Sequence, residues 1–508
     1  MAKYKSYNYS QTVMLPVSLK DQLAPGTLEF AIHTLVEERM DVSRFDERYS
    51  NDETGCKAYD PKILLKIILL AYSRGIVHSR KIERECKKNV TFMALSCGQQ
   101  PDHSTIAAFV SSLKEDIKPL FREVLMVCEE MGLLGGTEFS LDGCRLPSNA
   151  SMRWSGTFPS LQEKKEKLEQ RVAYMLEKQV EADRREGTDG SEETKKVKHI
   201  EKLKKQAARI AEFLEKNEPK QGKQHKEVRS NVTDNESAMM PTPHGTIQGY
   251  NGQALVDGKH QVIVGGEAFG WGQDDCHLEP VVTGAQENME AIGKEEDYFK
   301  DTILTADTGY HSSGSIKKCE DDGIDAYIPD REYRKRHPGL EVKKSSIALR
   351  RRKFRLEDFR YDESADEYEC PMGKKLTLNT DKVKANGGMV YRRYYADAVN
   401  CEACTVREGC ISNKGKRGKR KCLMILVETG MRNYSKEMAA KMDTDRGREI
   451  YPHRMKIVEP VFANIRTQKR LDRFTLRGKI KVNIQWLLYC MVHNIEKIAN
   501  FGPAFAVV

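Results

Sequence analysis

Two acidic residues stand where the sequence predicts that a strand ends. A strand predicted over residues 137–143 ends at Asp142, and a second apolar run, residues 302–306, ends at Asp307 and breaks at Gly309. Because an α/β sheet places ligands beyond the carboxyl ends of its strands, we expect these two carboxylates to lie together. They would repel each other unless a cation lay between them, and Mg²⁺ prefers such oxygen ligands. The pattern therefore indicates phosphoryl transfer with two metal ions, which stabilise the entering and leaving oxygens.

Such a site normally needs a third carboxylate, and Glu459 is the candidate. If a helix continues from Glu459, then Arg466 and Arg470 lie within about 20° of its direction at ~100° per residue. One helix face would then carry a carboxylate and two guanidinium groups suited to a phosphate backbone. The alternative is a surface acid paired with Arg466, and Pro460 raises the further prospect of a broken or kinked helix.

The elements that must position these residues follow a recognisable order. After the first strand comes a charged arm, and then a β-hairpin joined at Asp257-Gly258, a strong hairpin signal. Helices and strands alternate beyond it. The predicted elements are the hairpin at 251–269, a helix at about 280–299, the strand ending at Asp307, a helix at about 313–322 and a strand at 325–330. This order predicts an α/β fold with one sheet.

Helices predominate on either side of the first strand. Residues 60–130 show apolar side chains at three- and four-residue spacing, with Ser104 as the expected N-cap and Gly132 at the stop. Basic residues at 80–88 suggest a helix-turn-helix that grips DNA, although amphipathic helices are commoner than DNA readers. Residues 161–217 predict two long charged helices that turn back at 187–191. Their apolar stripe is narrow and runs through Leu168, Val172, Leu176 and Val180.

Length and composition limit the class of protein. The chain has 508 residues, 39% hydrophobic and 31% charged. A length of ~100–200 residues per domain predicts two to four units. No apolar run approaches the ~20 residues that span a bilayer, and residues 1–19 lack the apolar core of a signal peptide. Thirteen cysteines, an odd number, fit a reducing compartment. We expect a cytoplasmic protein with no membrane partner.

Positive charge gathers in the last third of the chain. The formal net charge of +9 is mild, but four basic clusters stand out, at 331–339, 349–355, 414–421 and 466–481. A single cluster is equally consistent with a solvated loop. Four together favour nucleic acid, whose backbone would hold them by counterion release.

Four cysteines within a short segment raise a separate question. Cys401 and Cys404 have the two-residue gap of a zinc knuckle, Cys410 follows, and Cys370 lies upstream. Four thiolates in this segment could close a tetrahedral structural zinc site, with Cys422 as a substitute ligand. The alternative is a set of ordinary reduced cysteines.

Other residue patterns carry less. His103 and His311 are typical of capping or hydrogen-bonding positions, and the pair Asp274 and Asp275 is expected to cap a helix. No glycine-rich phosphate loop of the P-loop type occurs, which argues against an ATP-driven mechanism.

Four motifs occur in the order of a known family. They are Tyr59–Glu83 with Pro101–Phe109, then Leu141–Ser151, Thr305–Ser312 and Tyr451–Trp486. Over most of its length the chain resembles the DDE transposases of bacterial insertion sequences. More specifically, it is similar to the insertion-sequence-four-type superfamily, which has a ribonuclease-H-like core and a helical N-terminal domain.

The resemblance implies roles for individual residues. Asp142, Asp307 and Glu459 would bind two Mg²⁺ or Mn²⁺ ions, while Tyr451 and Arg454 would contact the DNA end near the cut. Two departures affect these roles. Four residues instead of the usual three separate Arg454 from Glu459, and Arg466 stands where a lysine is usual, with a different phosphate geometry.

The expected protein is a Mg²⁺-dependent transposase that cuts and joins double-stranded DNA at the inverted repeats of its element. The resemblance adds a homo-oligomer, since two ends must be joined. A non-catalytic DNA-binding descendant and a plain metal-dependent nuclease are the alternatives. The expected domains are a helical DNA-binding domain (1–135), the first strand of the core (136–160), a helical-hairpin insertion (161–230), the central core (231–335), a basic Cys-containing insertion (336–440) and C-terminal catalytic helices (441–508).

Overall fold

The computed structural model describes residues 18–48, 57–183, 190–222, 226–337, 354–384, 390–411, 419–427 and 432–502. The chain forms two compact units. The first comprises Met1–Tyr310, Lys318–Ile328 and Arg448–Val508, and the second comprises His311–Lys317 and Pro329–Gly447. None of the described helices combines the length and apolar character needed to cross a bilayer.

A mixed sheet forms the centre of the first unit. Its strands are β1 (Glu138–Pro147), β4 (Ala238–Thr242), β5 (Gly245–Asp257), β6 (Ile263–Phe269), β7 (Ile303–Ala306) and β8 (Asp325–Tyr327). The order is β4-β5-β1-β7-β8, with β6 also paired to β5. β5 runs antiparallel to β1, β4 and β6, whereas β7 and β8 run parallel to β1. This mixed α/β arrangement is compatible with the expected ribonuclease-H-like core.

The predicted element order is confirmed, but several element ends differ: β5 begins at Gly245 instead of 251, and β8 ends at Tyr327 instead of 330. β1 does not end at Asp142 but continues to Pro147, because β5 remains paired with it from Ala254 to Gly249. The helix predicted to reach residue 299 is α9 (Leu278–Ala291). It ends early because Gly293, at φ +88°, donates its N–H to the Glu290 carbonyl, a C-terminal cap that favours glycine.

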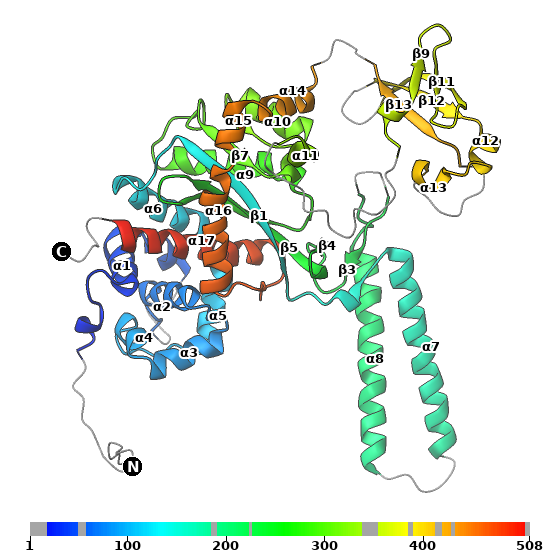
Figure 1. Ribbon diagram of the computed structural model, residues 1–508. Coiled ribbons are helices and arrows are strands. Elements are labelled where there is room, and N and C mark those ends of the chain that lie inside the picture. The colour runs from blue at the N-terminus through cyan, green and yellow to red at the C-terminus, as the bar shows by residue number, and fades with distance from the viewer. Residues whose placement is uncertain are drawn as a thin grey trace, which may run out of the picture. The chain divides into compact units, whose positions relative to one another are not determined.

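The N-terminal helices and the C-terminal helix share one core. The helices are α1 (Leu28–Thr34), α2 (Pro61–Ser73), α3 (Ser79–Lys88), α4 (Val90–Leu95), α5 (His103–Ser112), α6 (Ile117–Glu130) and α17 (Lys479–Phe501). α17 packs against α1, α2, α6 and β6 (Figure 1). Its buried Trp486 donates its indole N–H to the carbonyl of Gln253 in β5, at 2.9 Å. The sheet and the helical domain are therefore joined through α17.

Helix caps test two of the sequence expectations. Gly132 adopts φ +67° and donates its N–H to the Glu129 carbonyl, which confirms the predicted stop. The predicted N-cap Ser104 is wrong: Asp102 caps α5 by accepting the N–H groups of Ser104 and Thr105, at 2.7 and 2.9 Å. A carboxylate at this position also interacts with the helix dipole, which a serine hydroxyl does not match.

The predicted arm is a hairpin of α7 (Phe158–Asp183) and α8 (Gly190–Lys216), which lie side by side in Figure 1. Residues 187–189 of its predicted turn lie outside the described residues. β2 (Ser155–Gly156) and β3 (Ser230–Asn231) pair at its base. The predicted stripe is wrong in its outer half, where Leu176 and Val180 are exposed. The less exposed α7 positions there are Met175 and Gln179, as a 3.5-residue period requires.

The second unit contains a five-stranded antiparallel sheet. In spatial order its strands are β13 (Cys422–Leu426), β12 (Val390–Ala396), β11 (Lys375–Lys384), β10 (Glu367–Glu369) and β9 (Arg360–Asp362). Phe359, Leu376, Tyr394, Ala396 and Leu423 form its core. Its helices include α11 (Tyr333–Arg336), α12 (Ala398–Glu402), α13 (Arg407–Cys410) and α14 (Tyr434–Met442). Most of the basic clusters at 349–355 and 414–421 lies outside the described residues.

Candidate active site

Asp142 and Asp307 meet where two parallel strands stop pairing. β1 and β7 pair as far as Leu141 and Ala306, so each aspartate directly follows the last pair. Asp142 Oδ1 accepts the N–H of Gly143 at 2.8 Å, and Asp307 Oδ1 accepts the N–H of Gly309 at 2.7 Å. The charge of Asp307 acts directly on Asp142. The structure thus brings together the first two carboxylates identified in the sequence.

Arg454 is the cation of this site. It lies in α16 (His453–Ala463), which packs against β1, and its Nη2 donates to Asp142 Oδ2 at 2.6 Å. The Arg454 side chain is 13% exposed, and its Nε is buried with no hydrogen-bond partner. Burial opposes its charge, but Asp142, Tyr451 and Asp307 outweigh burial and raise the pKa of Arg454. The guanidinium therefore stays charged, and one of its buried donors has no hydrogen-bond partner.

Burial makes ionisation of both carboxylates less favourable than it is in water. Burial raises the pKa of Asp142 to about 6, although Arg454 and the Gly143 N–H oppose the rise, and the charge of Asp307 adds to it. Burial is also the main cause that raises the pKa of Asp307, with the charge of Asp274 adding to it. Carboxylates that are costly to charge together are stabilised by a proton or by a cation. This donor set fits a hard divalent ion, which takes one or two carboxylates and keeps several waters.

Asp274 is a third carboxylate in this region, and the expected capping role for it is wrong. Its Oδ1 accepts hydrogen bonds from Asn251 Nδ2 at 2.6 Å and Gln253 Nε2 at 3.1 Å. Its Oδ2 accepts Arg145 Nη2 at 3.0 Å. The helix that follows has His277 at its N-cap and no side-chain cap. Three side-chain donors, one of them charged, outcompete a single helix N–H for this carboxylate.

Gly309 and Tyr310 come shortly after Asp307, and both lie against the carboxylates or their partners. A Cβ on Gly309 would lie 2.9 Å from Asp307 Oδ1 and 3.0 Å from Asp274 Oδ2. Only glycine therefore leaves both carboxylates free to approach this point. Tyr310 is fully buried and its hydroxyl donates to Gln253 Oε1. Burial raises the pKa of Tyr310 well above its usual value, so the hydroxyl remains a donor.

The residues around Asp274 were missed in the sequence, although β5 carries a signal. Asn251 and Gln253 are two residues apart, so both point to the same face of a buried strand. Opposite them in β1 stand Arg145 and Gly143. A Cβ on Gly143 would lie 2.1 Å from Gln253 Nε2, so no other residue fits there without movement. Two polar residues on a buried face predict a polar network of this kind.

Glu459 is not gathered with the two aspartates. It is exposed on α16, while Ile457 and Val458 beside it are buried. Five residues after Arg454, its direction lies about 140° from that of Arg454 around the helix. In the described part of the chain, no group of three or more His, Cys, Asp or Glu side chains is arranged to hold a metal ion. The metal-binding role of Glu459 therefore stays a prediction.

The helix that carries Glu459 continues through Pro460 but changes form. The Lys456 carbonyl, which loses its helical partner at Pro460, accepts Gln261 Nε2 at 2.9 Å. From Asn464 to Gln468 the chain forms a π-helix, and Arg470 follows outside it at φ +53°. The single face predicted for Glu459, Arg466 and Arg470 is therefore wrong, because the wider turn changes the direction of each later residue. Within the described ranges, Glu459 makes no ion pair with Arg466.

Two basic residues after this helix line a cleft of the first unit. Arg470 and Arg473 face Lys81 and His78 of the α3 region there, with Tyr72 and Tyr489 also in the lining. Lys469 differs from its neighbours because it is 1% exposed and its Nζ pairs with Glu496 Oε2 at 2.5 Å. The predicted basic segment 466–481 therefore contains both cleft-lining and core cations.

The four cysteines of the predicted zinc site lie in the second unit. Cys370, Cys401 and Cys410 pack against the core of its sheet, and Cys370 Sγ accepts the N–H of Lys374 at 3.4 Å. Burial raises the pKa of the Cys410 thiol, Lys421 opposes the rise, and Cys401, Cys370 and Cys404 add to it. The thiols are near enough to act on Cys410, but they are not arranged as a metal-binding group. Cys422 lies in β13.

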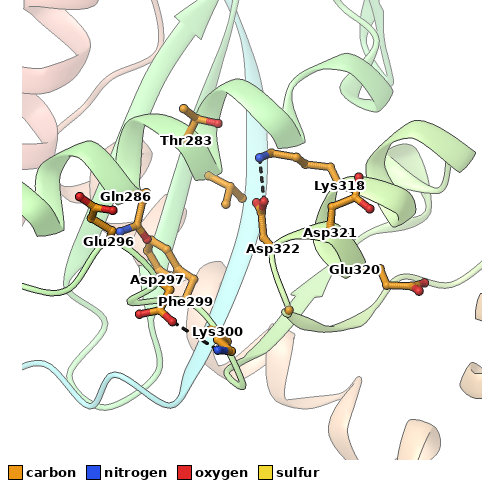
Figure 2. A pocket seen from close by; sticks show the side chains of 12 residues that line it. Thr283, Gln286, Glu296, Asp297, Phe299, Lys300, Lys318, Glu320, Asp321 and Asp322 are labelled. Carbon is orange, nitrogen blue, oxygen red and sulfur yellow. Dashed lines mark hydrogen bonds and ion pairs between the residues drawn. The ribbon is translucent and has the colours of Figure 1, made fainter.

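A separate cavity of the first unit lies between α9, the start of β7 and α10 (Ser313–Asp321). Figure 2 shows its charged lining, in which Lys318 pairs with Asp322 and Lys300 with Asp297, at 2.8 and 3.5 Å. Phe299 and Lys300 precede β7, whereas Asp307 follows that strand. The cavity is therefore at the opposite end of the parallel strands from the three carboxylates, and its lining is acidic, with five carboxylates against two lysines.

Comparison with known families gives two matches. Residues 369–499 match a family model described as a transposase DDE domain, and residues 17–112 match a transposase domain designated DUF772. No curated protein matches the chain. Tyr451, Arg454 and Glu459 lie inside the first matched segment, whereas Asp142 and Asp307 lie outside both. The matches confirm the resemblance drawn from the sequence motifs.

Proposed function

We propose, on the premise that this chain is a DDE transposase as its two matched segments indicate, that it cuts DNA at the ends of an insertion sequence and transfers the cut strand to new DNA. The observation that supports this most is that Asp142 and Asp307 lie close together, with the positively charged Arg454 beside them. Phosphoryl transfer needs little covalent chemistry from the protein, so positioning and charge are what such a site must supply.

Asp142 and Asp307 would hold Mg²⁺ or Mn²⁺, with Glu459 as the third ligand that the resemblance implies. When bound, two such ions activate a water or a 3′ hydroxyl and stabilise charge at phosphorus. Arg454 would contact the DNA end, as the resemblance implies, while its Nη2 stays on Asp142. Tyr310 and Gln253 would keep Asp274 and the neighbouring loop in one conformation.

Binding to duplex DNA would involve several surfaces. The helical domain carries α3, whose Lys81 lines the same cleft as Arg470 and Arg473. Cations on two segments of one cleft suit a phosphate backbone better than an isolated surface lysine. Tyr451 and Arg466 are assigned to DNA by the resemblance. We further propose that the protein works as a homo-oligomer on two element ends, in the bacterial cytoplasm.

The test uses a duplex that carries the genomic sequence flanking this gene, incubated with the protein and Mg²⁺. Asp142→Asn and Asp307→Asn should abolish strand cleavage, by more than about a thousandfold for a group that holds the reacting atoms. Binding of the same duplex, measured in the absence of metal, should remain within a few-fold of wild type. Glu459→Gln tests the third ligand in the same way.

The products decide between the alternatives. Strands joined to a second DNA molecule identify strand transfer, and cleavage without joining identifies a plain nuclease. Wild-type protein that binds the duplex but never cuts it would identify a non-catalytic DNA-binding protein. Cleavage by Asp142→Asn at the wild-type rate would refute the site itself.

We also propose a structural zinc site at Cys370, Cys401, Cys404 and Cys410. The electrostatic action of three thiols on Cys410 supports it. So does the Lys374 N–H bond to Cys370, because backbone N–H groups stabilise a thiolate. Since the thiols are not arranged as a metal-binding group here, zinc would have to draw them together. Elemental analysis should find one zinc per chain in wild-type protein and none in Cys401→Ser/Cys404→Ser. Wild-type protein purified without zinc, and unchanged in stability when zinc is added, would refute the site.

A further inference from the structure

The arm carries a row of positive side chains that the proposed chemistry does not use. Lys195, Lys198, Lys202, Lys205 and Arg209 all lie exposed on α8. At ~100° per residue these five positions fall within an arc of about 80°. The buried positions of α8 that face α7, such as Ile200 and Leu203, centre about 140° away from that arc. We call the five residues the α8 basic row.

The lysines of the α8 basic row differ in their partners from four other lysines of the arm. Elsewhere on the arm, four lysines each pair with a glutamate on the same helix. These pairs are Lys165–Glu169, Lys167–Glu163, Lys178–Glu181 and Lys216–Glu212. Within the described ranges, Lys195, Lys198, Lys202 and Lys205 form no ion pair. Arg209 instead stacks over the ring of Trp154, 5.6 Å from its centroid.

The row is also long and straight enough for a particular kind of partner. From Lys195 to Arg209 it extends about 21 Å at 1.5 Å per residue. The same distance along a duplex holds about six base pairs and presents a phosphate every ~1.7 Å when both strands are counted. Unpaired lysines at regular intervals match a uniform polyanion, whereas a folded acidic protein would require its carboxylates at those same intervals.

We infer that the α8 basic row is a DNA-contacting surface, which grips the phosphate backbone of a duplex without reading its sequence. The inference rests on the proposed function only in taking DNA as the partner. The α8 basic row lies on the inserted arm, whereas Asp142 lies in β1 and Asp307 directly follows β7. The row would therefore increase the affinity for DNA beside the cut without taking part in the chemical step. Its contribution should be electrostatic and therefore steeply dependent on salt.

The experiment compares two quadruple variants of the full-length protein that remove the same charge. One changes Lys195, Lys198, Lys202 and Lys205 to Gln, and the control changes the four ion-paired lysines, Lys165, Lys167, Lys178 and Lys216, to Gln. Binding to a mixed-sequence duplex of about 40 base pairs is measured by fluorescence anisotropy at several salt concentrations without metal. Glutamine is a good helix former, and equal helix content and melting temperature in both variants verify that the arm is intact.

The row variant should bind more than tenfold more weakly at physiological salt. The slope of log affinity against log salt should fall in magnitude by about 3 to 4, since each phosphate contact contributes about 0.9. The control should keep a slope within about 1 of wild type, because its lysines already have partners.

Equal losses in the two variants would trace the effect to net charge and overturn the inference. An unchanged slope in the row variant would also overturn it. If the row variant instead changed the oligomeric state of the free protein, the face would be a contact between copies. Failure of the proposed function is distinguishable, because cleavage by Asp142→Asn is judged separately from this metal-free binding.

Discussion

At the residue scale, three partly buried carboxylates are held in three different ways. Asp142 is paired with an arginine, Asp307 accepts a backbone N–H, and Asp274 accepts three side-chain donors. Burial raises the pKa values of Asp142 and Asp307. At carboxylates with raised pKa values, a bound cation offsets an unfavourable charge, so such groups are candidates for a metal site.

Binding of Mn²⁺ should weaken as the pH falls through 6. Because burial raises the pKa of Asp142 to about 6, the carboxyl is charged above that pH and protonated below it. Arg454 and Asp307 are the charged groups that act on it most. At pH 5 the apparent affinity should be about tenfold below its plateau at high pH, since a proton competes for the same oxygen. Electron paramagnetic resonance of free Mn²⁺ measures this, and a flat response between pH 5 and 7 contradicts it.

Asp274→Asn should slow DNA cleavage by about 10- to 100-fold, the usual cost of losing a group that orients metal ligands. The substitution removes the charge that Arg145 pairs with, and it replaces one of the two accepting oxygens by an NH2 donor that faces other donors. Asp297→Asn is the matched control, because it also breaks an ion pair, Asp297–Lys300, but on the exposed rim of the separate cavity. Rates are measured at saturating DNA. An Asp274→Asn enzyme as fast as the control would show that Asp274 is only structural.

The sequence reveals some of this site and not the rest, for a physical reason. Asp142 and Asp307 follow apolar runs, and a strand places its end residues predictably. Asp274 is held by residues 251, 253 and 145, and only the register between β1 and β5 decides that these meet. Glu459 is a residue whose position the sequence did not predict. Its helix was expected, but whether its carboxylate faces Asp142 depends on rotation about the helix axis, which burial of Ile457 and Val458 fixes.

At the element scale, the segment after α16 separates two kinds of cation that look alike in the sequence. Lys469 is buried and paired with Glu496 of α17, whereas Arg470 and Arg473 line a cleft. Burial lowers the pKa of Lys469, and Glu496 opposes that fall. The charge of Lys469 therefore depends on α17, and the pair joins the end of the π-helix to the core.

Glu496→Gln should lower the free energy of unfolding by about 3 kcal/mol, because it leaves a buried ammonium group without its counter-charge. The control is Glu267→Gln, which breaks the more exposed pair between Glu267 and Lys479, 2.7 Å apart. An exposed pair is worth less than about 1 kcal/mol. Urea unfolding monitored by circular dichroism measures both. Equal effects of the two substitutions would mean that Lys469 does not need Glu496.

Some element boundaries are set by the local sequence, and others are set by elements that are distant in the sequence. The stop at Gly132 and the hairpin at Asp257-Gly258 were predictable because the turn residues themselves decide them. The continuation of β1 past Asp142 was not, because β5 supplies the hydrogen bonds. The contact line of α7 also shifts for a distant reason: only the presence of α8 selects a 3.5-residue period over the four-residue step of Leu168, Val172, Leu176 and Val180.

At the scale of the whole molecule, each unit has its own core. The first contains the mixed sheet with α17, and the second has the small sheet around Leu376 and Tyr394. Units with separate cores can unfold separately. The transposase DDE match extends over parts of both, from residue 369 to 499, so the family pattern is not confined to one core.

Calorimetry should therefore show two transitions. Leu376→Ala, at a fully buried position of the second unit, should lower only one of them, and Leu488→Ala, fully buried in α17, only the other. Each substitution should cost about 2–5 kcal/mol, which shifts the affected transition by several degrees. Both variants lowering one common transition would show that the two units unfold together.

The short pairing of β2 with β3 has a consequence for how this chain can be altered. The chain leaves the core at Gly156 and returns at Ser230, and these two residues face each other across one strand spacing of about 4.8 Å. A segment whose two ends pair with each other in this way is an insertion that can be exchanged as one piece. It can be lengthened, deleted or exchanged for a tight turn while the sheet that carries Asp142 keeps its register. Evolution and the protein engineer have the same access to it, provided that a replacement covers Val232, which Leu161, Ile210 and Phe213 of the arm now bury.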